Sequence, residues 1–266
     1  MVLQDRVAVI TGSATGIGRA IALKMAEQGA HILVSDINQE AASRAVEEIR
    51  AFGVRAEADV TDVADASATA AMAEHAIKLF GRVDILVNNA GVAGAPGWYD
   101  RSESTEEDWE FTYKVNVRGT ANATNAVTPH MKTARSGKVL NLASIAGREG
   151  RPSLPHYSAT KAAVINYTQS LAMELAPFNI NVNAICPGLL WTPMWEQVGA
   201  RYAKNDPEYG GMEPRKVFEK MIAARIPLKR EQTPEDIGDA AVFLTSDLAR
   251  NITGQALDVD GGFFMR

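Results

Sequence analysis

The stretch Thr11-Gly12-Ser13-Ala14-Thr15-Gly16-Ile17-Gly18 follows the apolar run Val7-Ala8-Val9-Ile10 and leads into a segment with helical spacing of apolar residues. The run before it predicts a buried strand. Its glycines let the backbone turn tightly and approach a diphosphate, and a helix N-terminus offers free N–H groups and a positive dipole. Its Gly-x3-Gly-x-Gly spacing differs from the usual dinucleotide fingerprint, and a plain turn is the simpler alternative. Its position between a first strand and a first helix favours a nucleotide cofactor.

Strands and helices alternate along the rest of the chain. We expect strands at 7–10, 32–35, 55–60, 85–87, 138–142, 180–185 and 256–259, and helices at 18–28, 40–52, 63–80, 109–131, 157–176 and 234–246. Strict alternation implies parallel strands with right-handed crossovers. The expected fold is α/β, a single-domain Rossmann-like doubly wound parallel sheet of about seven strands with helices on both faces, spanning 1–266. Region 188–230 reads as one long irregular segment, which we expect to be a substrate lid.

Composition argues against several classes of protein. With 27 basic and 32 acidic side chains, the net charge is −5, and no basic run suggests nucleic-acid binding. No apolar run approaches the roughly 20 residues that span a membrane, and the N-terminus lacks the pattern of a signal peptide. The single cysteine, Cys186, reads as a buried, inert thiol, with a reactive thiol as the alternative, and the four histidines lack metal-ligand spacing. We therefore expect a cytoplasmic protein that uses no metal.

Tyr157 and Lys161 stand four residues apart in His156-Tyr157-Ser158-Ala159-Thr160-Lys161. On a helix such residues share a face, which places an ammonium group beside a phenol. A nearby cation favours the phenolate, so we expect Lys161 to lower the pKa of Tyr157 from about 10 toward neutrality. An ordinary surface pair is the alternative if the two residues are considered alone.

Carboxylates end the second and third predicted strands. Asp36 can bind the adenosine ribose hydroxyls and would repel the 2′-phosphate of NADP, and Ile37 and Asn38 bring no compensating cation. This predicts NAD as the cofactor, although a plain helix cap remains an alternative for Asp36. Asp59, followed by Val60, is a candidate for the adenine amino group.

Taken together, these features resemble the short-chain dehydrogenase/reductase family over nearly the whole chain. Thr11 to Gly18 matches the family's cofactor turn, and Asn88-Asn89-Ala90-Gly91 matches its Asn-Asn-Ala-Gly. Further matches are Asn116, Ser144 thirteen residues before Tyr157, the Tyr157-x3-Lys161 pair, and Pro187-Gly188 with Thr192. Each motif is weak alone, and their joint order is specific.

The resemblance implies a set of roles. Tyr157 is the general acid/base, Lys161 tunes it and holds the nicotinamide ribose, Ser144 polarises the substrate oxygen, and Asn116 holds a proton-relay water. For Asn116, an asparagine that bends a helix is the alternative. The implied cofactor contacts are Gly12, Ser13, Thr15, Gly16, Ile17, Gly18, Asp36, Ile37, Asp59, Val60, Asn89, Gly91, Tyr157, Lys161, Pro187, Gly188, Leu190 and Thr192.

The substrate is less well defined. Candidate contacts are Ala146, Arg148, Leu154, Trp191 and Trp195, with His156, Trp98, Tyr99, Met194 and Tyr202 as further candidates, and ordinary packing is an equal alternative for each. Similarity to family members acting on sugar alcohols and vicinal diols suggests a small diol or polyol. The resemblance also implies a homotetramer with interfaces at 109–131, 157–176 and the C-terminal segment 260–266.

Three functions remain open. The first is an NAD(H)-dependent oxidoreductase that acts on a secondary alcohol or ketone, such as a small diol, polyol or sugar alcohol. The second is a biosynthetic ketoreductase, for example of a 3-oxoacyl thioester, although Asp36 argues against NADPH. The third is a non-catalytic NAD-sensing module, against which the intact set of Asn116, Ser144, Tyr157 and Lys161 speaks.

Overall fold

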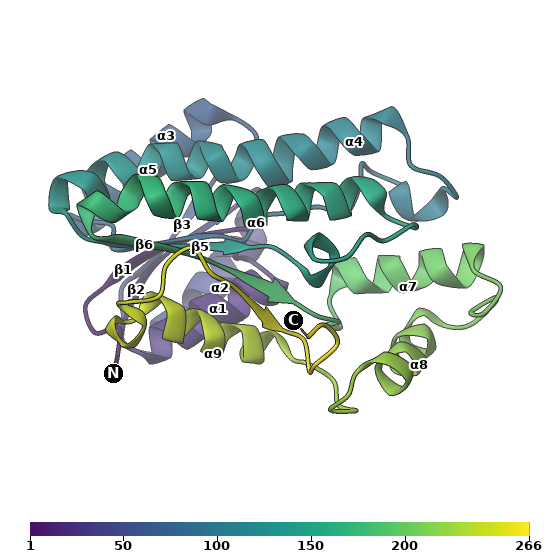
Figure 1. The fold of residues 1–266 in the computed structure, drawn as a ribbon. Helices are drawn as coiled ribbons and strands as arrows, with labels where there is room; N and C mark the ends of the chain where they lie inside the picture. Colours follow the sequence, from purple (N-terminus) through teal and green to yellow (C-terminus); the bar gives the residue numbers. More distant parts are fainter. Residues whose placement is uncertain (266) are drawn as a thin grey trace.

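The chain forms one α/β domain around a seven-stranded, fully parallel sheet. The computed structural model describes residues 1–265 (Figure 1). The strands run in the order β3-β2-β1-β4-β5-β6-β7 across the sheet. Their bounds are β1 Val7–Thr11, β2 His31–Asp36, β3 Ala56–Val60, β4 Ile85–Asn88, β5 Gly137–Leu142, β6 Ile180–Pro187 and β7 Ala256–Val259. The predicted fold class is thereby confirmed.

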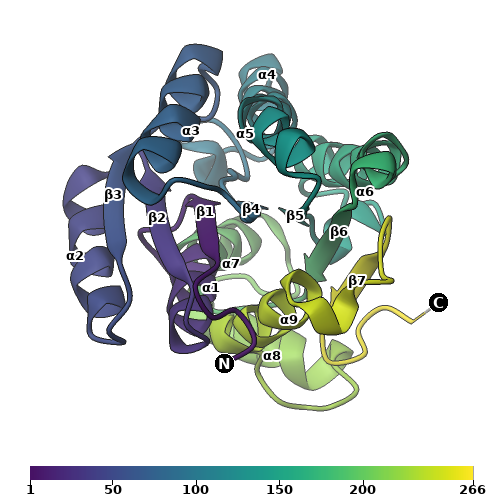
Figure 2. The ribbon, with the colours of Figure 1, turned by 90° about the vertical axis from the view of Figure 1, so that its left-hand side faces the viewer.

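Helices cover both faces of the sheet (Figure 2). One face carries α1 Gly16–Glu27, α2 Gln39–Arg50 and α9 Pro234–Thr245; the other carries α3 Ala66–Phe80, α5 Thr120–Ala134 and α6 Pro155–Leu175. Alternation within β1 sets the two cores, because Ala8 and Ile10 pack with the first group and Val9 with the second. Val9 is also in register with Leu33 of β2 and Leu86 of β4.

The chain order reverses beside β1. From β1 it moves outward to β2 and β3, and then returns to β4 on the opposite side of β1. Loops that follow β1 and β4 therefore diverge and leave a crevice at the carboxyl ends of the strands, which is where open α/β sheets bind ligands. The order of strands thus places the glycine-rich turn and the loop after β4 at one site.

The region expected to be irregular instead contains two helices, α7 Pro193–Asn205 and α8 Pro214–Arg225. Figure 1 shows them extending beyond the sheet. Each begins with proline at its first helical position, and Thr192 caps α7 by accepting from the Trp195 N–H at 3.3 Å. Their apolar faces form a small core of their own, made of Trp195, Tyr209, Val217, Phe218, Met221, Ile222 and Ile226.

The helix expected at 109–131 is longer than predicted and contains an irregular part. It runs from α4 Glu106–Thr112 through a π-helical segment, Tyr113–Gly119, into α5. Thr105 and Asp108 form a capping box that sets its start. The π-helical segment contains the buried Asn116.

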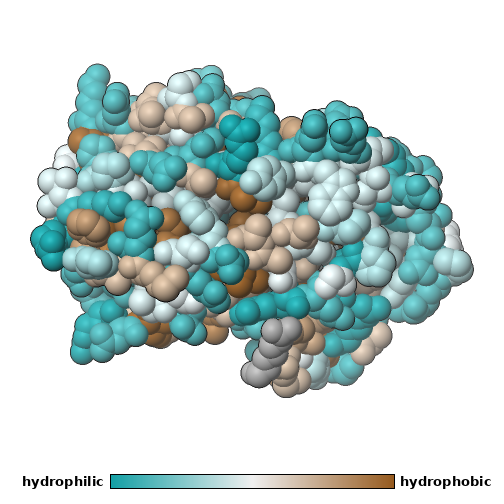
Figure 3. Space-filling model, turned by 45° about the horizontal axis from the view of Figure 1, so that its top comes forward, coloured by the Kyte–Doolittle hydropathy of each residue, from teal (hydrophilic) through white to brown (hydrophobic). Residues whose placement is uncertain are grey.

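The outer surface mixes hydrophilic and hydrophobic side chains (Figure 3). Exposed large apolar residues on the helices include Trp109, Tyr113 and Met173. Within residues 1–265, no helix combines the length and apolar character needed to cross a membrane. Cys186 is buried at the end of β6, and burial raises the pKa of its thiol to about 12, as expected for an inert side chain.

Candidate active site

A cavity of about 540 Å³ opens at the carboxyl ends of the central strands. Its lining comes from the loops after β1, β2, β3, β4, β5 and β6, from the start of α6, and from α7 and α8. One end lies beside β2 and β3, and the other lies beneath the two extra helices. The β1 turn and Tyr157 therefore line the same cavity.

The β1 turn is held against the loop after β4. Gly12 has φ +63°, and a Cβ there would come 2.7 Å from the Ala90 Cα, so the position accepts only glycine without strain. The Asn89 side chain donates to the carbonyl oxygens of Thr11 at 3.0 Å and Gly12 at 2.7 Å. Asn89 therefore joins the two loops at the point where the strand order reverses.

The N-terminus of α1 opens into this cavity. Thr15 is its N-cap but makes no side-chain capping hydrogen bond, and the first turn has no acidic residue. A Cβ at Gly16 would meet nothing within 4 Å. Unpaired N–H groups at the positive end of a twelve-residue helix suit a diphosphate. The residues present therefore fit the diphosphate of a dinucleotide.

The far end of the cavity is acidic. Asp36 accepts hydrogen bonds from the Ala14 N–H and the Asn38 N–H, each at 3.0 Å, which fixes its carboxylate beside the β1 turn. Ile37, Asp62 and Val63 also line this end. A carboxylate held this way is placed to accept hydrogen bonds from ribose hydroxyls.

Tyr157, Ser144 and Lys161 line the cavity together. Tyr157 and Lys161 lie in the first turns of α6, and Ser144 follows β5 as the N-cap of a short 3-10 turn, where it accepts from the Ala146 N–H at 3.1 Å. Lys161 is buried, and its Nζ donates to the carbonyl oxygen of Leu142 at 2.8 Å. The loop after β5 and the start of α6 thus bring a hydroxyl, a phenol and an amine together in the cavity lining.

The phenol of Tyr157 is difficult to ionise in this structure. Burial raises its pKa to about 12, and a hydrogen bond with Ser144 acts in the opposite direction. Burial also lowers the pKa of Lys161 to about 8. The expected drop of the Tyr157 pKa toward neutrality is not found, because the phenolate is desolvated and the lysine donates its hydrogen bond to Leu142.

Asn116 lies behind this group rather than in the cavity lining. Its Oδ1 accepts from the Val92 N–H at 2.8 Å, and its Nδ2 donates to the Val92 carbonyl at 2.9 Å and to Thr160 Oγ1 at 3.1 Å. A Cβ on Gly91 would meet both Asn116 Oδ1 at 3.2 Å and Lys161 Nζ at 3.3 Å. The asparagine therefore stands next to the lysine while it holds the loop after β4.

The half of the cavity near Tyr157 has apolar walls. Leu154, Met194 and Val198 pack with Tyr157 in one hydrophobic cluster, and Trp195 lines the cavity from α7. Polar lining residues here include Ser153 and Tyr202, whose hydroxyl groups lie 3.2 Å apart. This half suits an apolar body that carries a few polar groups.

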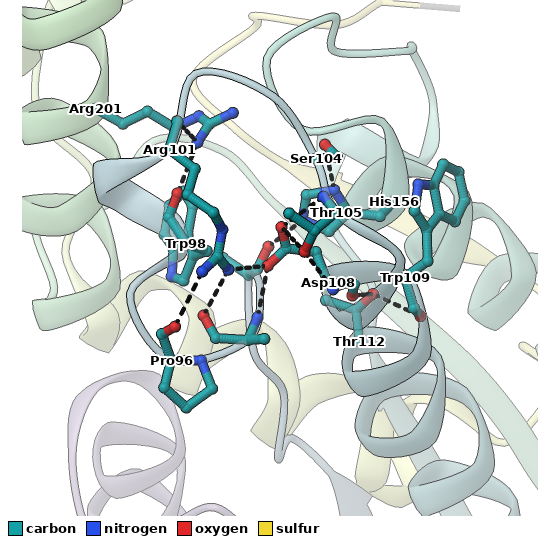
Figure 4. A network of polar contacts seen from close by, with 12 residues as sticks. Pro96, Trp98, Arg101, Ser104, Thr105, Asp108, Trp109, Thr112, His156 and Arg201 are labelled. Atoms are coloured by element: carbon teal, nitrogen blue, oxygen red, sulfur yellow. Dashed lines mark hydrogen bonds and ion pairs between the residues drawn. The ribbon is translucent and has the colours of Figure 1, made fainter.

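A polar network fixes α7 to the loop at 95–105 (Figure 4). Arg201, 5% exposed, donates to the carbonyl oxygens of Trp98 at 2.7 Å and Ser102 at 3.1 Å, and also to that of Arg101. Arg101 in turn pairs with Asp108 at 2.6 Å. Desolvation raises the pKa of Asp108, but hydrogen bonds from the Thr105 N–H, from Arg101 and from the Ala95 N–H outweigh it and lower the pKa to about 2. One wall of the cavity is thereby attached to the start of α4.

Most predicted site residues line the cavity. They are Gly12, Thr15, Gly16, Ile17, Gly18, Asp36, Ile37, Asn89, Gly91, Ser144, Ala146, Leu154, Tyr157, Lys161, Pro187, Gly188, Leu190, Thr192, Met194, Trp195 and Tyr202. The residues that do not line it are Ser13, Asp59, Val60, Trp98, Tyr99, Asn116, Arg148, His156 and Trp191.

The predicted site residues outside the cavity lining contact other parts of the fold or face outward. Ser13 donates to the Ile10 carbonyl, Asp59 contacts His75 at 2.5 Å, and Val60 faces outward. Arg148 pairs with Asp258 at 3.0 Å, and Trp191 packs on Phe218. His156 lies between Ser104 and the Ala93 carbonyl, where burial lowers its pKa.

Several lining residues were not predicted from the sequence. Asp62 and Val63 lie just beyond the predicted Asp59 and Val60, and Lys114 and Val115 come from the π-helical segment. Arg151, Met221, Arg225 and Phe263 line the half near Tyr157. Position after a strand could have suggested Asp62, whereas the others depend on how α8 and the C-terminal segment fold over the cavity.

Comparison with known proteins agrees with this geometry. A family described as Enoyl-(Acyl carrier protein) reductase matches residues 12–264. Subunit BbsD of (2S)-[(R)-hydroxy(phenyl)methyl]succinyl-CoA dehydrogenase from Thauera aromatica is 39% identical over 98% of each chain. The 3-oxoacyl-[acyl-carrier-protein] reductase FabG of Thermotoga maritima is 36% identical, over 98% of this chain and 99% of the relative. A crystal structure of NAD+-bound xylitol dehydrogenase superimposes with a TM-score of 0.91 at 34% identity, covering 98% of this chain and 99% of that one.

The fold and these relatives define a nicotinamide-dependent oxidoreductase acting on CH–OH or ketone groups. The chain belongs to the short-chain dehydrogenase/reductase family.

Proposed function

We propose that this protein transfers hydride between NAD(H) and a secondary alcohol or ketone, with Ser144, Tyr157 and Lys161 as its reacting group. One observation carries the proposal: these three side chains meet at one end of a cavity whose other end holds Asp36 beside an open helix N-terminus. A bound nicotinamide dinucleotide would be held along the cavity, with its diphosphate at the β1 turn.

The preference for NAD follows from Asp36. A 2′-phosphate beside this carboxylate would repel it, at roughly 4 kcal/mol per pair of unit charges 4 Å apart at an effective dielectric near 20. Asp62 adds a second negative charge at the same end. The xylitol dehydrogenase that this chain resembles was crystallised with NAD+, which supports the same choice.

The chain's own residues would manage the proton. During oxidation the Tyr157 phenolate accepts the hydroxyl proton, while the Ser144 hydroxyl donates a hydrogen bond to the substrate oxygen. A bound nicotinamide would supply the hydride chemistry and, when oxidised, a positive charge that favours the phenolate, whose pKa burial otherwise raises to about 12. Lys161, buried next to Asn116, would hold the nicotinamide ribose and pass protons toward solvent.

For the substrate, a small diol, polyol or sugar alcohol is the first class. Its support is the likeness to xylitol dehydrogenase and the hydroxyl groups of Ser144, Ser153 and Tyr202 in the lining. A 3-oxoacyl thioester is the second candidate, because relatives named for acyl thioesters match the full chain and the walls near Tyr157 are apolar.

The setting of the enzyme follows the family. We infer that α7 and α8, within 188–230, act as a substrate lid, since they cover the half of the cavity near Tyr157. We also propose a cytoplasmic homotetramer, as the family resemblance implies; exposed apolar side chains on the helical face, including Tyr113 and Met173, support self-association. Of the predicted C-terminal interface at 260–266, residue 266 lies outside the described residues. Light scattering of the purified protein tests the tetramer.

A panel of secondary alcohols, diols, polyols and 3-hydroxyacyl thioesters, each offered with NAD and with NADP, tests the proposed function. NADH absorbance reports turnover. We expect oxidation of a subset of the panel with NAD preferred. Absence of hydride transfer to or from every compound, by a protein that still binds NAD, would overturn the proposal.

A further inference from the structure

The two halves of the cavity differ in charge. Within residues 1–265, the acidic lining residues are Asp36 and Asp62, and both lie at the end beside β2 and β3. The half near Tyr157 has no lining carboxylate among the described residues, yet it contains Arg151 and Arg225. Lys114 and Lys161 also line the cavity, and the α1 N-terminus suits a diphosphate, so the contrast between the halves rests on side-chain carboxylates: the half near Tyr157 has none among residues 1–265 and favours an anion.

Arg151 is held close to the start of α6, which carries Tyr157. It stands six residues before Tyr157, and its backbone N–H donates to Ser158 Oγ at 3.2 Å, next to the catalytic tyrosine. Its guanidinium carbon lies 4.8 Å from the centroid of the Phe263 ring, which orients the planar group. The side chain is 17% exposed. Both contacts place a preorganised cation in the cavity lining.

This cation is only weakly compensated. Arg151 Nη2 is buried without a hydrogen-bond partner among residues 1–265. The carboxylate beside it belongs to Glu149, whose Oε2 lies 3.4 Å away but whose side chain is 55% exposed. Glu149 is thus the exposed member of the pair, and the Arg151 guanidinium donates no hydrogen bond to residues 1–265, so it keeps donors for an anion.

Other arginines differ from Arg151 because their guanidinium groups already have hydrogen-bond partners. Arg148 pairs with Asp258. Arg101 pairs with Asp108, and Arg201 donates to backbone carbonyls (Figure 4). Arg225, in the last turn of α8, is exposed and has no hydrogen bond or ion pair with residues 1–265. Its position could reflect only the negative end of the α8 dipole. Arg151 therefore carries the argument, and Arg225 adds a second positive charge to the same lining.

We propose that the substrate carries a negatively charged group, such as a carboxylate, which Arg151 binds while Tyr157 and Ser144 hold the reacting oxygen. The inference rests on the proposed function and narrows its substrate class to anionic secondary alcohols and ketones. A guanidinium suits this task because its fork of N–H donors matches a carboxylate or phosphate. The apolar wall of Leu154, Met194 and Val198 receives the carbon chain between the two polar ends.

Binding of non-reacting probes tests the proposal without turnover. The probes are 4-methylpentanoate and 4-methylpentanamide, which differ in charge and little in shape, titrated calorimetrically into the protein with NADH. We expect the acid to bind at least tenfold more tightly than the amide. Arg151→Gln should weaken binding of the acid about tenfold or more and change binding of the amide less than twofold. Arg151→Lys should fall between, because lysine retains charge but loses the fork.

Glu149→Gln should have the opposite effect on binding of the acid. Removing the exposed carboxylate next to Arg151 should tighten binding of the acid about two- to fivefold and leave the amide unchanged. Lys216→Gln is the matched control on α8, since Lys216 is exposed, pairs with Glu219 and lies outside the cavity lining. Thermal unfolding of each variant excludes misfolding. Equal binding of acid and amide, or a preference that survives in Arg151→Gln, overturns the proposal.

Kinetics then separate two sources of the charge. 3-Hydroxybutyrate, its methyl ester and 3-hydroxybutyryl-CoA are compared in wild type, Arg151→Gln and Arg225→Gln. If the substrate is a carboxylate, kcat/KM for the free acid should fall in Arg151→Gln alone, mainly because KM rises. If the phosphates of a coenzyme A thioester are bound instead, kcat/KM for the thioester should fall in Arg225→Gln as well as in Arg151→Gln. Turnover of the neutral ester at least equal to that of both anions contradicts the inference while it leaves the proposed function standing.

Discussion

The ammonium group of Lys161 lies 5.7 Å from the centre of the Tyr157 ring, on the same face of α6. The lysine is therefore a neighbour of the aromatic ring rather than a direct partner of the phenol oxygen, and its hydrogen bond goes to the Leu142 carbonyl. Ionisation of the phenol then depends on Ser144 and on the charge that a bound cofactor brings. We therefore propose that Tyr157 acts as a base only once the cofactor is bound.

Tyr157→Phe should lower kcat by about 10²- to 10⁴-fold, the range for loss of a general acid/base, while NAD affinity changes little. Stopped-flow or steady-state NADH absorbance measures kcat, and fluorescence titration measures binding. Tyr167→Phe is the control on the same helix, because Tyr167 lies outside the cavity lining. Full turnover by Tyr157→Phe would remove the tyrosine from the mechanism.

Asp36→Ala should narrow the preference for NAD over NADP, since it removes the carboxylate that repels a 2′-phosphate. The ratio of kcat/KM for the two cofactors measures the change, and we expect it to fall at least tenfold. Asp59→Asn is the comparison, because this carboxylate contacts His75 and not the cavity. An unchanged ratio in Asp36→Ala, or a wild type that prefers NADP, would contradict the assignment.

Lys161 should make the cofactor-free protein more stable as the pH rises from 8 to 10.5. Its pKa is lowered to about 8 in the folded state from 10.5, so the unfolded chain binds more protons in this window. The gain relative to Lys161→Met is on the order of 3 kcal/mol at about 1.36 kcal/mol per pH unit. Denaturant melts at pH 7.5, 9 and 10.5 measure it. Parallel pH profiles for the two proteins would argue against this burial penalty.

Alcohol oxidation should accelerate with pH, and ketone reduction should slow. Oxidation needs the Tyr157 phenolate and reduction needs the phenol, and burial raises the pKa of this group to about 12 without cofactor. With NAD bound the midpoint should lie lower, because a positive ring favours the phenolate. Profiles of kcat/KM from pH 6 to 10 in both directions measure this. A flat oxidative profile would count against Tyr157 as the base.

Arg201→Leu should loosen the lid. The change leaves the carbonyl oxygens of Trp98, Arg101 and Ser102 without their buried donor, which costs on the order of 1–3 kcal/mol of stability. We expect substrate KM to rise and NAD affinity to stay the same. Lys204→Gln is the control, since Lys204 contacts the same loop from the exposed side of α7. Equal effects of the two substitutions would assign no special role to the buried arginine.

The sheet was predictable because its strands are short apolar runs bounded by turn residues. Ala8 to Ile10 and Ile32 to Val34 are buried and lie where the pattern placed them. Helices α7 and α8 were missed although their start signals were present in Pro193 and Pro214, each at a first helical position. Val217, Phe218, Met221 and Ile222 show helical spacing, but they pack on each other rather than on the sheet.

Other features depend on tertiary contacts that no local pattern encodes. Asp59 lies near the end of β3 and Asp62 just after it, and only the fold directs the first to His75 and the second to the cavity. Likewise, the role of Arg151 depends on Phe263, which is distant in sequence. The pKa of Tyr157 depends on burial that composition cannot reveal.

The π-helical segment between α4 and α5 limits how this chain can change in length. The segment is π-helical, with a wider turn than an α-helix, so deleting one residue from Tyr113–Gly119 cannot keep both Asn116 and the helix that follows in their present positions. Either Asn116 would lose Val92 and Thr160, or Ala123, Val127 and Met131 would leave the core. Substitutions can accumulate along this helix, whereas insertions and deletions within it would separate the chemistry from the scaffold.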